Sequence, residues 1–347
     1  LCLALTVAGQ AATLNVPGSY ATVQLAMAAA NPGDTVLLAA GTYSENVDTV
    51  RDGSSGLPIT IDGQGVATIR QIDVSHAYHT IKDVTFAGVS SAAESKILVK
   101  RNAHYLLVED VVVDAEEILD VRGISWINAV TPPFGTGDVA SNCTLRRVTI
   151  QNVRGIPFLS IEGDDWVVED CIFQDGEDAD FMQVWGRRGI IRRNIFRRMY
   201  DGPDSNHIDW IQTFGTNGFG SKDHLIEGNF VEDCPGAAFG QLEGHLQSEI
   251  KDWTFQNNIF TEIGSTMSVS IPGMKFYGNV FYKVGYVAES VVVNAVRRWY
   301  ESVSIHSSVA DKALMTVHTA SGDLVADGRY IPYMPLKTSG EIEDGVL

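Results

Sequence analysis

The chain has few cysteines, and this shortage excludes a disulfide-stabilised scaffold. Its 347 residues include four cysteines. Cys2 lies in an apolar N-terminal segment, whereas Cys143, Cys171 and Cys234 fall at different points of the repeat described below. An odd number of scattered cysteines does not form a framework of pairs, so we expect these three to be buried thiols.

Positive charge and long apolar runs are also scarce. Lysine and arginine number 25 against 43 aspartates and glutamates, which gives a formal net charge of −18. Such an excess disfavours nucleic acids and anionic membranes as partners. A polyuronate would also be repelled unless calcium or local arginines intervene. Beyond the N-terminal segment, no apolar stretch is long enough to span a bilayer.

The first eleven residues are typical of the end of a secretory signal peptide. Residues 1–8 are mostly apolar, and the small residues Gly9 and Ala11 stand where a cleavage site requires them. We predict a signal-peptide remnant at 1–11, a single domain at 12–347, and a secreted or extracytoplasmic location. The alternative for 1–11 is a buried apolar strand.

A short strand-like pattern recurs five times in the middle of the chain. It occupies residues 160–163, 183–186, 212–215, 241–244 and 270–273, at steps of 23, 29, 29 and 29 residues. A period of 20–50 residues is typical of stacked structural units rather than of a globular core. Because the units alternate like strands, the repeat predicts a β-solenoid.

A second column of segments runs in phase with the first. Each segment ends in an anchor residue followed by an apolar pair, and the last four anchors are Asn194, Asn229, Asn258 and Asn279. Stacked side-chain amides satisfy one another, so we expect an internal asparagine ladder. The predicted fold class is all-β, a single-stranded parallel β-helix of about ten coils. We expect an N-terminal cap with a short helix at 12–45, clear coils at 58–285, and the last coils with a C-terminal cap at 286–347.

Charged residues alternate in sign from one coil to the next. Glu109 and Asp110 align with Arg146 and Arg147, and the alternation continues through the later coils. Opposite charges on neighbouring strands stabilise a sheet, so this pattern predicts structural ion pairs rather than a polyanion site. Arg187 lies outside these columns, and its role stays open.

The strand alternation predicts an outward face that binds sugars. Side chains alternate across a strand, and the residues with the parity opposite to the apolar lumen set include aromatic rings beside a column of glutamines. Exposed contiguous aromatics mark binding surfaces. The predicted substrate-binding residues are Phe181, Gln183, Trp185, Trp210, Gln212, Phe214, Gln241 and Glu243. The alternative is that a loop covers these rings and makes them a second core.

Carboxylates gather beside the same coils. Asp180 aligns one coil below Asp209, which would place the two about 5 Å apart. Such a pair can share a proton, bind a cation together with Asp178, or serve as acid and nucleophile. Their parity is that of the lumen, so they lie at a corner or are paired structurally. His207 is a further candidate base, with a hydrogen-bonded turn histidine as the alternative.

The N-terminal segment resembles that of a known superfamily. An Ala-rich helical stretch at 20–30 is followed by Pro-Gly-Asp-Thr at 32–35 and Ala-Gly-Thr-Tyr at 40–43. This order resembles the first coils of the pectin-lyase-like superfamily, and it implies a right-handed parallel β-helix that acts on carbohydrate. Asp180 and Asp209, with Asp178, are also similar to the calcium aspartates of family nine pectate lyases, although both glycines of those motifs are missing. That resemblance implies a Ca²⁺ ion and a catalytic lysine, for which Lys222 is the nearest candidate.

Three functions follow as hypotheses. The preferred one is a polysaccharide lyase that cleaves a uronate-containing glycan by β-elimination, with Ca²⁺ or Arg187 neutralising the carboxylate and Lys222 or an arginine abstracting the proton. The second is a glycoside hydrolase that uses Asp180 and Asp209, or Glu243 with one of them. The third is a non-catalytic carbohydrate-binding or adhesin-like β-helix. We expect a polysaccharide or oligosaccharide partner, no organic cofactor, and a monomer or homotrimer.

Overall fold

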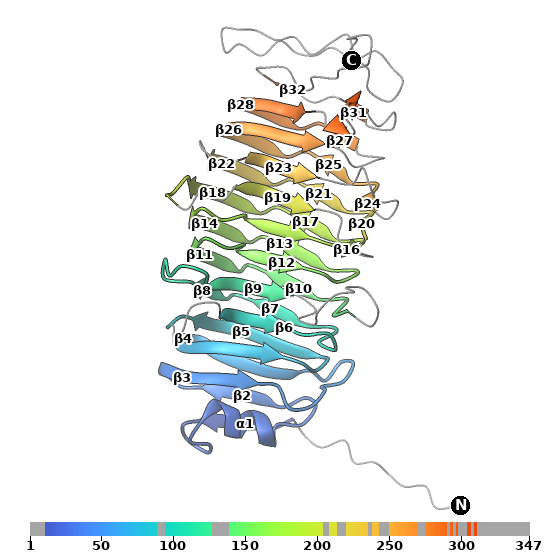
Figure 1. Cartoon of the computed structure of the whole chain (residues 1–347). Helices are drawn as coiled ribbons and strands as arrows, with labels where there is room; N and C mark the ends of the chain where they lie inside the picture. The colour runs from blue at the N-terminus through green and yellow to red at the C-terminus, as the bar shows by residue number, and fades with distance from the viewer. Residues whose placement is uncertain are drawn as a thin grey trace, which may run out of the picture.

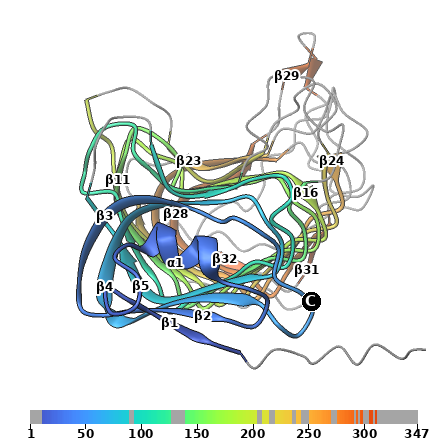
Figure 2. The same cartoon turned by 90° about the horizontal axis from the view of Figure 1, so that it is seen from below.

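The chain winds into a parallel β-helix. The computed structural model describes residues 11–88, 94–126, 139–203, 208–213, 220–234, 238–242, 250–269 and 275–289, together with short strands at 292–293, 296–297, 304–306 and 309–310. Successive coils stack along one axis, and each coil contributes strands to three sheets that surround a central lumen (Figures 1 and 2).

The first sheet contains the segments of the second sequence column. Its strands are β1 (Thr13–Val16), β2 (Thr35–Leu38), the start of β4 (Ile59–Val74), the start of β5 (His79–Phe86), β7 (Leu107–Glu109), β10 (Thr144–Arg146), β13 (Val167–Glu169), β17 (Ile190–Arg192), β21 (Leu225–Glu227), β25 (Thr254–Gln256), β27 (Lys275–Tyr277) and β31 (Ser304–His306). All of these pairs are parallel, and from β5 to β27 they keep the register that the sequence alignment predicts, as in Thr144↔Val167.

The second sheet follows the first within each coil. Its strands are the start of β3 (Gly41–Asp48), the middle of β4, the end of β5, β8 (Val112–Asp114), β11 (Thr149–Arg154), β14 (Ile172–Glu177), β18 (Ile195–Tyr200), β22 (Phe230–Cys234), the start of β26 (Ile259–Val269), the start of β28 (Val280–Glu289) and β32 (Val309–Ala310). Strands β31 and β32 lie beyond residue 285 and pair in parallel with β27 and β28.

The third sheet carries the repeat that begins at Ser160. Its strands are the ends of β3 and β4, β6 (Ser95–Val99), β9 (Arg122–Trp126), β12 (Leu159–Ile161), β15 (Met182–Val184), β19 (Asp209–Thr213), β23 (Ala238–Leu242) and the end of β26. A small parallel sheet continues from it, formed by β16 (Gly186–Arg187), β20 (Ser221–Lys222) and β24 (Ile250–Lys251). The strands β29 (Val292–Val293) and β30 (Val296–Arg297) form an antiparallel pair.

A short helix lies at the N-terminal end of the stack. Helix α1 (Val23–Ala29) begins after Thr22, whose side chain accepts a hydrogen bond from the Leu25 backbone N–H. Its buried residues face β1, β2 and β3, and Figure 2 shows it across the end of the lumen. Its function as a cap stays a prediction. The proposed signal-peptide remnant lies almost entirely in residues 1–10, outside the described residues.

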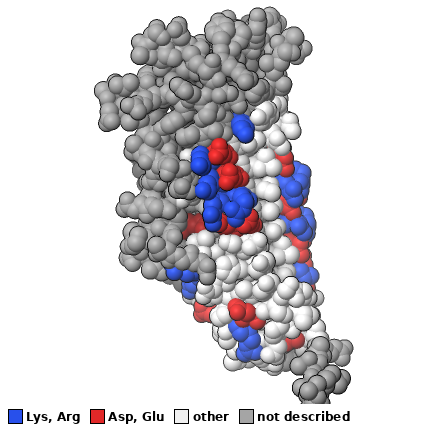
Figure 3. Space-filling view, turned by 90° about the vertical axis from the view of Figure 1, so that its right-hand side faces the viewer, with Lys and Arg blue, Asp and Glu red and all other residues white. Residues whose placement is uncertain are grey.

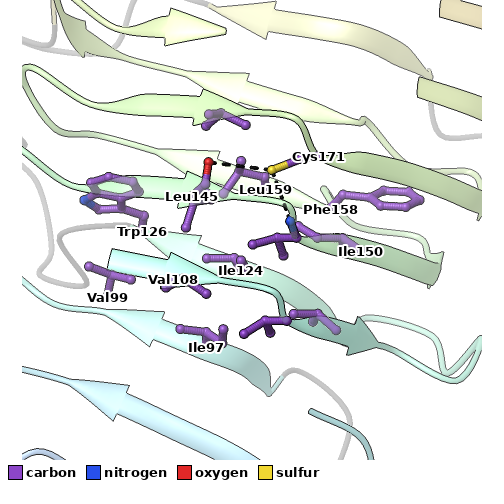
Figure 4. Close-up of a cluster of buried hydrophobic side chains, with 14 of the residues drawn as sticks. Ile97, Val99, Val108, Ile124, Trp126, Leu145, Ile150, Phe158, Leu159 and Cys171 are labelled. Atoms are coloured by element: carbon purple, nitrogen blue, oxygen red, sulfur yellow. Dashed lines mark hydrogen bonds between the residues drawn. The ribbon is translucent and has the colours of Figure 1, made fainter. Parts of the chain in front are cut away.

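Apolar side chains fill the lumen in columns along the axis. In the third sheet Ile97, Ile124 and Leu159 stack in register, and Val108 lies below Leu145 in the first (Figure 4). The three predicted thiols are free and buried, and burial raises the pKa of Cys143, Cys171 and Cys234 to about 12. These cysteines are therefore core residues, as predicted.

The asparagine ladder is confirmed. Each buried amide oxygen accepts from the backbone N–H and the side-chain amide of the preceding asparagine: Asn229 from Asn194 at 3.0 Å, and Asn258 from Asn229 at 3.0 and 2.9 Å. Asn279 accepts in the same way from Asn258. The ladder thus satisfies polar groups at a turn that points into the lumen.

The charge columns are structural, as the sequence predicts. Arg147 lies 2.6 Å from the Asp110 carboxylate, and Arg193 lies 2.7 Å from that of Asp170. Between them, Glu169 accepts from Arg146 and Arg192 on either side. These guanidinium groups lower the pKa of Asp110 and Asp170.

Candidate functional site

Two aspartates and two glutamines form one network where the third sheet begins. The Asp209 backbone N–H donates to Asp180 Oδ1 at 2.9 Å, so the two aspartates lie on adjacent coils as predicted. Gln183 Nε2 donates both to Asp180 Oδ2 at 2.9 Å and to Gln212 Oε1 at 2.8 Å, and Gln212 Nε2 lies 3.3 Å from Asp209 Oδ2. Each aspartate therefore pairs with the glutamine three positions later on its own coil.

This network is buried. Asp180 is 6 % exposed and Asp209 is fully buried, and Gln212 is also buried, whereas Gln183 is half-buried. Their carboxylates accept from amide groups rather than facing solvent. The geometry therefore fits a ladder that joins coils, and a catalytic role for Asp180 and Asp209 stays a prediction.

The predicted calcium site gains no support from this arrangement. Asp178 is buried, and its Oδ1 accepts from the Gly202 backbone N–H at 2.8 Å. Within the described part of the chain, no group of three or more His, Cys, Asp or Glu side chains is placed to hold a metal ion. Asp178, Asp180 and Asp209 do not form such a group, so their arrangement does not fit a calcium site.

The expected outward aromatic face is wrong. Phe181 is 1 % exposed and Trp210 is 2 % exposed. Both rings pack edge-on against Phe196 in the lumen, at centroid distances of 5.5 and 5.8 Å, and Trp210 also lies 5.0 Å from Phe260. Phe181 directly precedes β15, and Trp210 is the second residue of β19, a strand in which every residue is buried. These two residues therefore belong to the core.

The remaining residues of the predicted binding face include one more buried ring, a glutamine and residues that the structure does not describe. Trp185 is also buried, so it offers no open ring to a sugar. The backbone pairing Gln212↔Gln241 extends the glutamine column to a third coil, as expected. His207, Phe214 and Glu243 lie outside the described residues, as does the side chain of Gln241.

Arg187 and Lys222 lie together at the far end of the third sheet. Arg187 pairs with Lys222 on the adjacent coil, and Lys222 pairs with Lys251 on the next, through β16, β20 and β24. We call these three residues the cation column. Figure 3 shows basic side chains gathered with acidic ones on this side of the molecule. Asp180 precedes β15 and Arg187 follows it, so the predicted carboxylates and cations lie at opposite ends of the third sheet.

An ion pair anchors the base of the cation column. Arg187 Nε donates to Asp164 Oδ2 at 2.8 Å, and the same carboxylate oxygen also accepts from its Nη2. This contact raises the pKa of Arg187, with Arg188 opposing through its like charge. The neighbouring Arg188 is bound by Asp165 at 2.6 Å. Arg187 is thus exposed but oriented, with its guanidinium at a fixed place on the surface.

Lys251 is the residue that the sequence analysis missed. It follows Lys222 by 29 residues, which is the step of the repeat, so aligning the residues after each repeat would have found it. It is half-buried and on an edge strand of the small sheet. Its position extends the cation column to three consecutive coils.

Comparison with known proteins was informative at the level of the fold. No family model matches the chain, and no curated protein matches it. Among solved structures, a PL6 family polysaccharide lyase from Pseudopedobacter saltans superposes with a TM-score of 0.58 at 14 % identity, covering 95 % of this chain and 88 % of that one.

Two further solved structures are similar at lower scores. The pectate lyase Pel9A gives a TM-score of 0.48 at 14 % identity, covering 87 % of this chain and 77 % of its own. The pectin methylesterase from Aspergillus niger gives 0.42 at 12 % identity, covering 84 % and 88 %. The fold assignment therefore rests on the first superposition and on the parallel pairing described above.

No helix in the described residues is both long enough and apolar enough to cross a membrane. The strands, their parallel register and the superposition agree on one architecture. The chain has a right-handed parallel β-helix fold, similar to that of the PL6 family polysaccharide lyase.

Proposed function

We propose that this protein is a polysaccharide lyase that cleaves a uronate-containing glycan by β-elimination. The observation that supports it best is the cation column, three basic side chains on consecutive coils of a chain whose net charge is −18. Such a chain repels polyanions overall, so a local row of cations favours one anionic ligand at one place. The similarity to polysaccharide lyases in fold is consistent with this substrate class, although fold alone does not establish it.

The spacing of the cation column suits a polymer with repeated carboxylates. Adjacent strands lie about 4.8 Å apart, so Arg187 and Lys251 are separated by about 10 Å along the axis. A carboxylate about 4 Å from one cation gains about 1 kcal/mol in water and more where water is partly excluded. Arg187 can form paired hydrogen bonds with a carboxylate, whereas each lysine acts as a point charge.

The proposed reaction uses two members of the column. Arg187 binds the uronate carboxylate and so favours the charge that develops when the neighbouring C5 proton leaves. Lys222 acts as the general base and takes that proton. The electron pair of the C5–H bond forms a C4=C5 double bond, the bond from C4 to the glycosidic oxygen breaks, and the leaving oxygen receives a proton from water. Lys251 binds a second carboxylate of the same chain.

A hydrolase centred on Asp180 and Asp209 receives less support. A retaining glycosidase needs both carboxylates at the sugar, whereas Asp209 is fully buried and both are bound by glutamine amides. We therefore place the chemistry at the cation column. We also propose an extracellular location, which suits a polymeric substrate.

The test is an activity panel on the purified protein. Polygalacturonate, alginate, chondroitin and a neutral glycan are each incubated with calcium or with a chelator, and both ultraviolet absorbance and reducing ends are followed. A lyase produces unsaturated ends that absorb and a matching number of reducing ends. Reducing ends without absorbance would contradict elimination and favour the hydrolase. Binding without products would favour the non-catalytic alternative.

Variants then locate the site. Lys222→Ala is expected to abolish the ultraviolet signal, and Lys251→Ala is expected to raise KM with little change in kcat. Lys82→Ala is the matched control, because Lys82 is a surface lysine bound to Asp62 at 2.9 Å on the first sheet. Full activity in a folded Lys222→Ala protein would remove the cation column from the mechanism.

A further inference from the structure

Two tyrosines stack on the outside of the solenoid. The rings of Tyr78 and Tyr105 lie parallel, with centroids 4.6 Å apart and an angle of 5° between planes. Tyr105 is 48 % exposed, and Tyr78 is half-buried. We call this pair the tyrosine platform. It presents a flat apolar ring to solvent beside hydroxyl groups.

The tyrosine platform and the cation column occupy the same corner of the solenoid. Backbone hydrogen bonds join successive turns there: Tyr78 N–H donates to His104 O, Tyr105 N–H to Ser141 O, Asn142 N–H to Asp164 O, and Asp165 N–H to Arg187 O. In parallel pairing this pattern places residues 78, 105, 142, 165 and 188 in one line along the axis. Tyr105 is therefore three coils from Arg188, which neighbours Arg187, or about 14 Å.

The turn that carries both tyrosines is left-handed on successive coils. Tyr78 and Tyr105 have φ values of 57° and 58°. Asn142, Asp165 and Arg188 follow at the same turn with φ values of 59°, 55° and 57°. The conformation therefore belongs to the corner, and what distinguishes the first two coils is the stacked pair of rings.

We propose that the tyrosine platform is a distal glycan subsite, which stacks against a sugar ring of the chain whose carboxylates the cation column binds. This inference rests on the proposed function, because it takes the same acidic glycan as ligand. Sugar rings expose C–H faces that pack on aromatic rings, and the hydroxyl groups of Tyr78 and Tyr105 lie at the edge. The glycan then lies along the solenoid axis, from the platform toward Lys251.

The test compares Tyr105→Asn with Tyr200→Asn. Tyr200 is 49 % exposed at the end of β18, so it controls for loss of an exposed ring elsewhere. Binding is measured by native affinity electrophoresis in gels that contain polygalacturonate, alginate or a neutral glycan. For the acidic polymer, Tyr105→Asn is expected to raise Kd about threefold to tenfold, whereas Tyr200→Asn leaves it unchanged. A disaccharide competitor is expected to show no difference between Tyr105→Asn and wild type at the cation column.

Thermal stability separates a binding role from a structural one. Asparagine suits the left-handed turn, so Tyr105→Asn is expected to keep or raise the unfolding midpoint. A lower midpoint with unchanged glycan binding would overturn the subsite and make the platform structural. If wild type binds an acidic polymer and Tyr105→Asn binds it equally well, the subsite fails while the proposed function stands. If only neutral glycans bind, and Tyr105→Asn weakens them, the proposed function fails and a stacking subsite for neutral sugar replaces the one proposed. Absence of binding to every glycan would overturn both.

Discussion

A buried histidine makes the solenoid sensitive to acid. His224 lies in the lumen between Trp166 and Trp253, at centroid distances of 5.3 and 4.8 Å. Its Nδ1 accepts from the Gly189 backbone N–H at 3.0 Å, which leaves the proton on Nε2, 3.2 Å from Ser221 Oγ. The Ser221 hydroxyl in turn donates to Val184 O at 3.0 Å. The imidazole is therefore held in one neutral tautomer.

Burial lowers the pKa of His224 from 6.5 to about 3. A histidine whose pKa is lower in the folded state stabilises the fold fully above the pKa of the unfolded chain, and this contribution is lost as pH falls from 6.5 toward 3. At about 1.4 kcal/mol per pH unit, the loss is about 2 kcal/mol at pH 5 and, because the folded state then begins to bind the proton, about 4 kcal/mol at pH 3. His79, with a pKa lowered to about 4 by burial, adds a smaller loss in the same direction.

The assay is urea unfolding followed by tryptophan fluorescence at several pH values between 7 and 4. His224→Phe keeps a ring between the two tryptophans and removes the titrating group, so its midpoint is expected to fall less steeply with acid than that of wild type. It loses the acceptor for Gly189, which costs about 1–3 kcal/mol at every pH. Ser221→Ala is the matched control, because it disturbs the same network and keeps the imidazole. Equal pH slopes for wild type and His224→Phe would refute the reasoning.

Two further substitutions test the core. Asn229→Leu breaks the asparagine ladder and leaves the Asn194 backbone N–H unpaired, so the free energy of unfolding is expected to fall by about 2–4 kcal/mol. The control is Asn257→Gly, at an exposed turn residue next to the ladder. An equal loss of stability in the two variants would argue against the ladder. Trp210→Ala is expected to lower the free energy of unfolding in urea by about 3–5 kcal/mol, because the Trp210 ring is packed in the lumen. A loss as small as that of Tyr200→Ala would instead support the outward aromatic face.

The parallel fold could be predicted because stacking imposes one register on every coil. Residues at equivalent positions must pair, so Asn194, Asn229 and Asn258 recur in phase, and the same alignment placed Asp180 below Asp209. The alternation of charge could be predicted for the same reason, since Arg147 and Asp110 form an ion pair between adjacent coils.

The sequence was misleading where both faces of a strand are buried. Alternation assigns inside and outside only where one face of the strand meets solvent, and every residue of β19 is buried, Trp210 included. The tyrosine platform was missed because Tyr78 and Tyr105 lie in a turn outside the aligned strands. Lys251 was missed for a related reason, since the alignment stopped at the repeat motif and did not follow the short strand after it.

The alternating charge column limits how this solenoid can lengthen. Along one line of the surface, Asp110, Arg147, Asp170 and Arg193 follow one another on successive coils, and each arginine binds an aspartate on an adjacent coil. Duplication or deletion of a single coil here would bring two like charges together at the new junction, at about 4.8 Å. A pair of coils could be inserted or removed with every contact restored. In this region we therefore expect insertions and deletions of two coils at a time to be tolerated, although the structural repeat is a single coil.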